Sequence, residues 1–247
     1  MSFLFKTLHF LHTGAAYVYA ALCASQNCIS CGGQSLYMPL CTNCRRELEK
    51  QSVCAENRCV FCGRLLVSEK KSCLECRETK IMCHVDGAYS LFPYLLWKKE
   101  LLFQWKTEGN RAFSSFFAGL IHKVLQNNYP DFAVVPVPPR PGKIFREGWD
   151  QIEDLCRYLN GLYGTRIYKA LRRLSSRQQK KLNRAERLSR VGKEYVLKKK
   201  YRHGTKLPHN LVLLDDIMTT GATLETCALI LKKSGVQRVY AVTLFSC

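Results

Sequence analysis

The stretch LVLLDDIMTTGAT, residues 211–223, carries most of the information about the fold. Its four leading apolar residues, Leu211 to Leu214, are typical of a short strand buried in a parallel sheet. Two aspartates stand at the carboxyl end of that strand, where open α/β sheets bind their ligands. Small residues follow and lead into a helix expected over residues 220–234. The stretch therefore predicts a strand, a loop and a helix in succession.

The loop of this stretch has the composition of an anion site. Small residues let backbone N–H groups turn toward an anion, the helix N-terminus adds a favourable dipole, and threonine hydroxyls add donors. Asp215 and Asp216 would repel the same anion, so they suit neutral hydroxyls or a metal ion. Ribose 5-phosphate satisfies both halves, because it joins a phosphate to a diol. A plain helix start beside two solvated aspartates is the disfavoured alternative.

Further strands and helices are expected on both sides of this stretch. Short apolar runs at residues 131–137 and 239–245 predict two more buried strands. Apolar spacings of three and four predict helices between residue 94 and about 126, broken at Gly109 and Asn110, with the second over 113–125. Another helix is expected over 150–162. Strands that alternate with helices form right-handed βαβ units in an α/β sheet.

Fourteen cysteines are present, and eleven of them lie between Cys23 and Cys83. Eight form four C-x-x-C pairs, a spacing that favours closed, structural zinc sites over disulfides or an iron–sulfur cluster. Gly32 and Gly63 follow the second cysteine of two pairs and allow tight turns in what we expect to be short hairpins. Sequential pairing is predicted, with a cross-braced arrangement left open. The ligands are Cys28, Cys31, Cys41, Cys44, Cys59, Cys62, Cys73 and Cys76.

The chain is strongly basic. It has 38 Lys or Arg residues against 19 Asp or Glu residues, a net charge of +19, which favours polyanionic partners. Residues 171–206 alone carry 14 Lys or Arg and two Glu, a net charge of +12. This segment is expected to be a loop that closes over a phosphorylated ligand, a nucleic-acid contact or a solvated loop.

The apolar start of the chain predicts an amphipathic helix within residues 1–27. Lys6, His9 and His12 interrupt it, so no stable membrane span is expected. The clustered thiols indicate a reducing compartment, and the protein is therefore expected in the cytoplasm.

Residues 211–223 resemble the motif with which type I phosphoribosyltransferases bind phosphoribosyl pyrophosphate (PRPP). The Val-Pro-Val-Pro run at 135–138, the Arg-Glu-Gly-Trp-Asp-Gln run at 146–151, the run at 177–182 and the four cysteine pairs resemble the ComF family over roughly residues 28–247. Glu147, Trp149 and Asp150 depart from the family's Arg-Gly-Phe-Asn-Gln pattern.

The resemblance implies a type I phosphoribosyltransferase-like α/β fold with a parallel sheet and an N-terminal cysteine-rich double zinc ribbon. It implies the ribbon over 28–83 and the α/β domain over 84–247, which follow the amphipathic helix expected over 1–27 from its apolar pattern. Two structural zinc ions and Mg²⁺ bound with PRPP are the expected cofactors. Arg140, Arg177 and Arg187 are expected to be catalytic, with Lys106 a weaker candidate. PRPP would bind to Asp215, Asp216, Met218, Thr219, Thr220, Gly221, Ala222 and Thr223.

The resemblance also links the chain to DNA uptake in natural competence. One hypothesis is a transferase that acts on PRPP, with the acceptor unknown. The other is a non-catalytic PRPP sensor that binds single-stranded DNA as an adaptor of the DNA-processing machinery. The expected partners are PRPP and either single-stranded DNA or competence and DNA-processing proteins.

Overall fold

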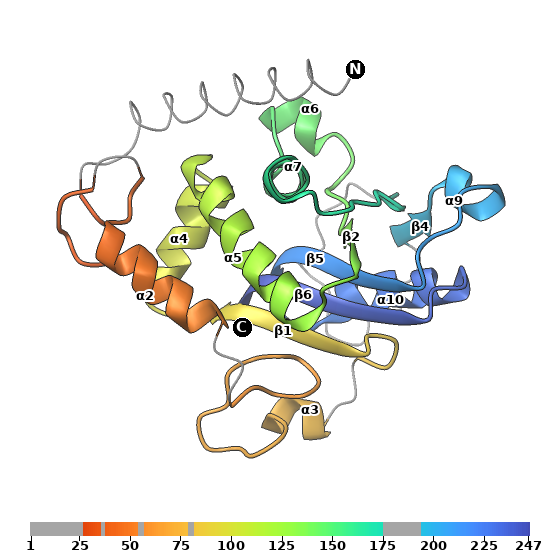
Figure 1. The fold of residues 1–247 in the computed structure, drawn as a ribbon, viewed down its shortest axis with the longest axis horizontal. Coiled ribbons are helices and arrows are strands. Elements are labelled where there is room, and N and C mark those ends of the chain that lie inside the picture. Colours follow the sequence, from red (N-terminus) through yellow and green to blue (C-terminus); the bar gives the residue numbers. More distant parts are fainter. Residues whose placement is uncertain (1–26, 36–37, 54–56, 79–81, 175–193) are drawn as a thin grey trace.

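A computed structural model describes residues 27–35, 38–53, 57–78, 82–174 and 194–247. Its centre is a sheet of four parallel strands in the order β1-β6-β5-β2 (Figure 1). The strands are β1 (Gly87–Pro93), β2 (Ala133–Pro136), β5 (Asn210–Met218) and β6 (Arg238–Ser246). A separate antiparallel pair joins β3 (Leu171–Arg173) to β4 (Tyr195–Leu197). The predicted α/β fold with a parallel sheet is confirmed.

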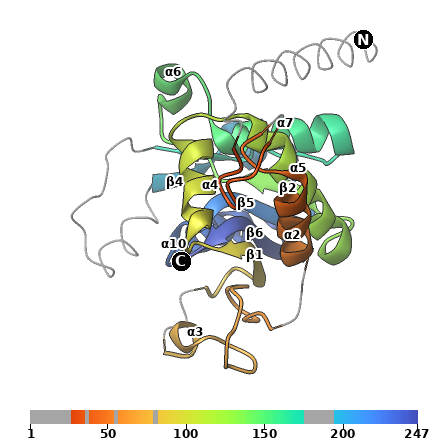
Figure 2. The same cartoon turned by 90° about the vertical axis from the view of Figure 1, so that its left-hand side faces the viewer.

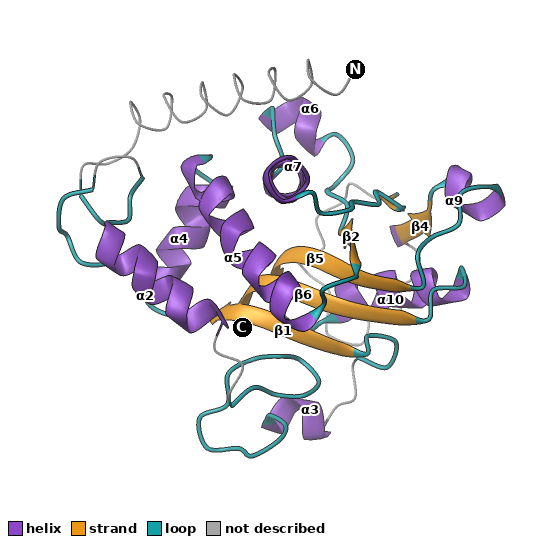
Figure 3. Ribbon diagram, viewed as in Figure 1, coloured by secondary structure: helices purple, strands orange, loops and turns teal. Residues whose placement is uncertain are grey.

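Helices cover both faces of the sheet, as Figure 3 shows. Strand alternation sends Val212, Leu214 and Val242 toward a layer formed by α4 (Trp97–Lys106), α5 (Ala112–Asn128) and α7 (Gln151–Tyr163). Leu211, Leu213 and Ala241 instead pack against α10 (Ala222–Lys233) and the β3–β4 pair. The remaining helices are α2 (Thr42–Val53), α3 (Leu74–Glu78), α6 (Lys143–Glu147) and α9 (Lys199–His203). Both sheet faces are thus buried, which explains the uninterrupted apolar run of β5.

The two cysteine-rich segments lie at different places around this sheet. Residues 27–53 end in α2, which packs beside α5. Residues 57–78, with α3, lie beyond the edge strand β1, where Figures 1 and 2 both place them. Short hairpins were expected throughout both segments. That expectation is wrong for their second halves, because Thr42–Val53 and Leu74–Glu78 are helical.

Most of the other predicted elements are confirmed, with strand β5 extending four residues past the expected apolar run. Strand β1 was not expected. Its sequence GAYSLFP mixes small and polar residues, and only pairing with β6 makes it a strand. Among the described residues, the structure has no helix that is long and apolar enough to span a membrane. The helix predicted within residues 1–27 falls almost wholly outside the described part of the chain.

Candidate functional site

The carboxyl ends of β5 and β2 border a cavity of about 700 Å³. Strand β2 ends at Pro136 opposite Leu214, whereas β5 runs on to Met218, so Asp215 and Asp216 project past the end of β2. Helices α4 and α7, the loop after β2 and the β3–β4 pair complete the wall. The lining residues are Lys106, Thr107, Glu108, Gly109, Val137, Pro138, Pro139, Arg140, Lys143, Glu147, Trp149, Asp150, Gln151, Ile152, Arg173, Tyr195, Asp215, Asp216 and Thr223.

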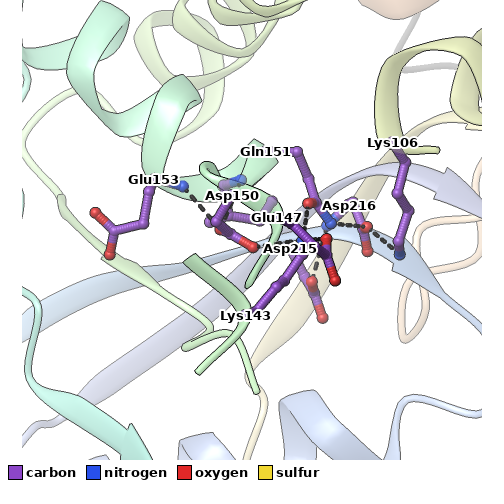
Figure 4. Close-up of polar contacts among 9 residues, drawn as sticks. Lys106, Lys143, Glu147, Asp150, Gln151, Glu153, Asp215 and Asp216 are labelled. Carbon is purple, nitrogen blue, oxygen red and sulfur yellow. Dashed lines mark hydrogen bonds and ion pairs between the residues drawn. The ribbon is translucent and has the colours of Figure 1, made fainter. Parts of the chain in front are cut away.

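Asp216 is the buried member of the aspartate pair. Its Oδ2 accepts hydrogen bonds from Lys106 Nζ at 2.5 Å and Gln151 Nε2 at 2.7 Å (Figure 4). Burial opposes ionisation, but Lys106, Gln151 and the backbone N–H of Ile217 together hold the pKa of Asp216 below its ordinary value. Asp216 is therefore an anion already matched to a cation from α4.

Asp215 points to the opposite face of the strand, because neighbouring residues of a strand alternate. Its Oδ1 accepts a hydrogen bond from the backbone N–H of Asp216 at 2.9 Å. Enclosure by the protein raises the pKa of Asp215 well above its ordinary value, and the charge of Asp216 raises it further. The pKa values of the two carboxyl groups are thus shifted in opposite directions, and a cation or hydroxyl donors beside Asp215 would favour its ionised form.

The loop after β5 turns through Gly221 into α10. Gly221 has φ 77° and ψ −5°, a left-handed conformation that favours glycine. Thr220 Oγ1 accepts a hydrogen bond from Ala222 N at 3.4 Å, so the first turn of α10 starts with a hydroxyl beside its amides. Of residues 218–223, Thr223 lines the cavity and Met218 is buried at the end of β5. The strand, loop and helix predicted from residues 211–223 are confirmed, while their ligand stays a prediction.

A network of hydrogen bonds around the start of α7 orients the side chains beside the two aspartates. Asp150 caps the helix, its Oδ1 accepting from Ile152 N and Glu153 N at 3.1 Å each. Lys143 Nζ donates to Asp150 Oδ2 at 2.7 Å and to Gln151 Oε1. Gln151 is oriented in this way with its amide toward Asp216. The sequence analysis quoted residues 146–151 as a motif but assigned no role to Lys143 or Gln151.

The cationic candidates divide between described and undescribed residues. Arg140 and Lys106 line the cavity, as expected of residues that meet a phosphorylated ligand. Arg177 and Arg187 lie outside the described residues. The sequence analysis missed Arg173, which lines the cavity from β3 and pairs with Glu194 at 3.0 Å. In the sequence, Arg173 is one of many basic residues in the segment 171–206, and nothing there distinguishes it from the other Lys and Arg residues.

The eight predicted cysteine ligands form two groups of four. One group joins Cys28, Cys31, Cys41 and Cys44; the other joins Cys59, Cys62, Cys73 and Cys76. In each group all four sulfurs lie within 4.8 Å of one another. The Cys31–Cys41 and Cys62–Cys73 sulfur pairs are 3.7 Å apart, close to the edge of a tetrahedron around zinc with bonds of about 2.3 Å. The sequential pairing is confirmed, and the cross-braced alternative is excluded.

Each group combines a tight turn with a helix start. Gly32 N donates to Cys28 O at 2.7 Å and Gly63 N to Cys59 O at 2.8 Å, with φ values of 72° and 69° at the two glycines. Burial disfavours thiolates, yet hydrogen bonds from nearby backbone N–H groups lower the pKa of Cys28 to about 6 and that of Cys59 to about 7. Each group thus contains one thiol that ionises readily, whereas burial and then the neighbouring thiols raise the pKa of Cys62 to about 12 and also raise that of Cys76.

Two curated proteins align with most of the chain. Competence protein ComFC of Streptococcus pneumoniae (strain ATCC BAA-255 / R6) is 26% identical over 208 residues, which cover 83% of this chain and 86% of that protein. Competence protein ComFC of Bacillus subtilis (strain 168) is 30% identical over 206 residues, which cover 79% of each chain. No protein-family model matches the sequence. The identity to the second protein across most of both chains, together with the two cysteine groups on a parallel α/β fold, shows that this chain belongs to the ComF family.

Proposed function

We propose that this protein binds PRPP together with Mg²⁺ in the cavity at the carboxyl end of β5 and serves DNA uptake in natural competence. The observation that carries the proposal is the position of Asp215 and Asp216 beside the left-handed Gly221 turn and the N-terminus of α10. The role in competence is inferred from the two relatives, both named competence proteins. The cytoplasm is its proposed location, because cysteines that gather in groups of four suit metal binding in a reducing compartment.

The ribose hydroxyls of PRPP would donate hydrogen bonds to the two aspartates. Lys106 Nζ already donates to Asp216 Oδ2 at 2.5 Å. The incoming diol would therefore replace this hydrogen bond or share the carboxylate with Lys106. The 5′-phosphate would meet the amides and hydroxyls of residues 219–223 at the start of α10, assisted by the helix dipole. The pyrophosphate would then face Arg140, Lys143 and Arg173 across the cavity.

Mg²⁺ would supply charge neutralisation for the pyrophosphate. The chain fits this requirement at Asp215, whose pKa is raised first by burial and then by the charge of Asp216. A cation brought in with PRPP favours its ionised form. Two zinc ions, one in each cysteine group, are proposed as structural, because four thiolates leave no open position for a substrate.

Thermal unfolding with PRPP and Mg²⁺ tests the ligand. A ligand bound only by the folded state raises the melting temperature, by about 2.7 kcal/mol of stabilisation at a hundredfold excess over Kd. Asp215→Asn with Asp216→Asn is expected to abolish the shift while both zinc ions remain. Asp131→Asn with Glu78→Gln removes the same charge at two exposed carboxylates and should leave the shift intact. A double aspartate variant that responds like the wild type contradicts the diol assignment.

Pyrophosphate release separates a transferase from a sensor. In a transferase, the cations stabilise charge that develops on the leaving group. Arg140→Ala, Arg177→Ala or Arg187→Ala would then slow pyrophosphate release far more than it weakens PRPP binding. Release from wild-type protein is measured over bases, nucleotides and single-stranded DNA as acceptors. Failure with every acceptor class favours the second candidate, a non-catalytic PRPP sensor that binds single-stranded DNA, which the charge of +19 also supports.

A further inference from the structure

A second cavity of about 660 Å³ adjoins the first one. The two share Pro138, Pro139, Arg140, Lys143 and Arg173, so only the loop after β2 and one side chain of β3 separate them. Asp215, Asp216 and Thr223 line the first cavity and are absent from the lining of the second among the described residues. The second cavity is therefore lined separately from the two aspartates and the start of α10.

Apolar side chains, one of them an exposed aromatic ring, are part of the lining of this cavity. Ile144 and Phe145 of α6 are exposed by 47% and 93%. Helix α6 stands between Gly142 and Gly148, which have φ values of 75° and 74°, and none of its residues is buried. The prolines of the preceding loop extend the apolar surface. A flat hydrophobic ligand can stack on the Phe145 ring without any side chain being displaced.

Cations also line the cavity. The lining contains six Lys or Arg residues and one carboxylate, Glu153, which is already bound to Lys169. In the described part of the chain, Arg140, Arg172 and Lys198 have no ion pair. Burial lowers the pKa of Lys198, and the positive charges of Lys169, Lys200 and Arg172 lower it further against the pull of Glu153. These cations repel one another, so an anion bound among them would reduce the repulsion between their charges.

We propose that the second cavity binds a nucleotide unit, with its base stacked on Phe145 and Ile144 and its phosphate held by Lys169, Arg172 and Lys198. An acidic peptide would satisfy the cations but would leave the exposed aromatic face uncovered. A nucleotide satisfies both, because every base has a flat face and every phosphate a negative charge. The unit is either a free mononucleotide or one residue of a single strand. The proposal goes beyond the PRPP site, since binding here requires neither PRPP nor Asp215 and Asp216.

Fluorescence anisotropy of a labelled oligothymidylate of about twelve nucleotides tests this site, a length within the ~4–16 nucleotides common for such grooves. Phe145→Ala should weaken binding roughly five- to hundredfold, the range that loss of one stacked base gives, and Phe145→Trp should restore it. Phe61→Ala removes an aromatic ring that is 42% exposed in the second cysteine segment and is the matched control. The PRPP-induced thermal shift and zinc content of the same variants should be unchanged, which separates this proposal from the PRPP site.

A charge series tests the phosphate half. Lys169→Ala, Arg172→Ala and Lys198→Ala together should flatten the salt dependence, by a slope of about 2 for three phosphate contacts on a single strand. Lys70→Ala, Lys71→Ala and Arg77→Ala remove the same charge from exposed residues of the second cysteine segment. Equal losses in both triple variants would mean diffuse attraction and would overturn the site.

Competitors identify the source of the nucleotide. Thymidine monophosphate that displaces the oligonucleotide at similar nucleotide concentrations indicates a free mononucleotide, whereas affinity that increases with strand length indicates a single strand. Both results support a nucleotide site. Displacement by poly-glutamate as efficient as that by the oligonucleotide, or a Phe145→Ala variant that binds like the wild type, would overturn it.

Discussion

The first cysteine segment is built into the helical layer, whereas the second sits beyond the edge of the sheet (Figures 1 and 2). In the first, Leu40 and Leu48 are buried in the core that α5 and α7 share. In the second, Val60, Phe61 and Val67 point outward, and Val67 is fully exposed. The two segments have the same ligands and nearly the same spacing. Metal chemistry alone therefore does not decide how a cysteine segment supports the rest of the molecule.

Their attachments differ in kind as well. The first segment is held through the C-terminal end of α2: Tyr89 Oη donates to the backbone carbonyl of Ser52 at 2.8 Å, and Lys98 Nζ donates to Gln51 Oε1 at 2.8 Å. The second is held by its turn, where Arg58 donates to Ser90 O and its guanidinium lies 4.1 Å from the Tyr89 ring centroid. We infer that loss of metal from the first segment spreads into the core, while loss from the second stays closer to β1.

Loss of a metal ligand gives the largest expected effect. Cys28→Ser should lower the free energy of unfolding by about 4 kcal/mol or more, because α2 loses its anchor and exposes core residues. Cys59→Ser should lower it by about 2 kcal/mol or less, since the second segment can open by itself. Urea unfolding monitored by circular dichroism, with zinc content measured in parallel, checks both values.

Cys156→Ser is the control for this comparison, since Cys156 is buried in α7 and lies outside both metal groups. It should leave the zinc content at two ions per chain. A Cys59→Ser variant that unfolds as readily as Cys28→Ser would show that the two segments support the fold equally.

Two glycines provide a smaller and more local comparison. Gly32 and Gly63 occupy the same turn position with nearly the same φ, yet a Cβ on Gly63 would lie 2.1 Å from Ala88 O, while one on Gly32 would meet nothing within 4 Å. Gly32→Ala should therefore cost about 1 kcal/mol, from left-handed backbone strain alone. Gly63→Ala should cost about 2–3 kcal/mol, because it must also push the turn away from β1.

Thermal unfolding and zinc content of the two glycine variants check this expectation. Equal costs would mean that the close contact between the second segment and β1 contributes nothing to stability. A loss of zinc in Gly32→Ala alone would mean that the strain acts on metal binding and not on packing.

Sequence reasoning worked wherever a local pattern was sufficient. The run 211–223 identified β5, its loop and α10, and the cysteine spacing identified both metal groups with their pairing. It failed for β1, because Gly87–Pro93 becomes a strand through hydrogen bonds to β6, more than a hundred residues away in the chain. It also failed for α2, since the whole of that helix belongs to a region whose cysteines suggested hairpins.

The site was predicted in part for the same reason. Asp215 and Asp216 stand in a recognisable local motif, but their partners come from other elements. Lys106 of α4 and Gln151 of α7 donate to Asp216, and Arg173 of β3 lines the same cavity. Nothing in the neighbourhood of those three residues along the chain indicates that they meet. Only the fold, by bringing the ends of β2 and β5 together, joins them in one cavity.

The smallest expected effect concerns the contact between α10 and the residues that follow the second cysteine segment. His84 follows this segment, and its backbone N–H and Nδ1 contact Glu225 of α10, at 2.9 Å and 2.5 Å. The second segment is thus linked to the helix that follows the proposed phosphate loop. Glu225→Gln should cost about 1 kcal/mol, because a neutral amide oxygen accepts these bonds less strongly than a carboxylate does.

Tyr89→Phe is the matched change at the first segment, since it removes one hydrogen bond to Ser52 O of similar expected value. Hydrogen exchange then separates the two. Glu225→Gln should speed exchange in residues 82–86 and in the first turn of α10, because His84 loses its charged acceptor and local opening becomes easier. Tyr89→Phe should speed exchange at the end of α2 and leave α10 unchanged. If Tyr89→Phe loosened α10 as much as Glu225→Gln does, the two segments would be coupled to the phosphate loop alike, and their different attachments would have no consequence for the site.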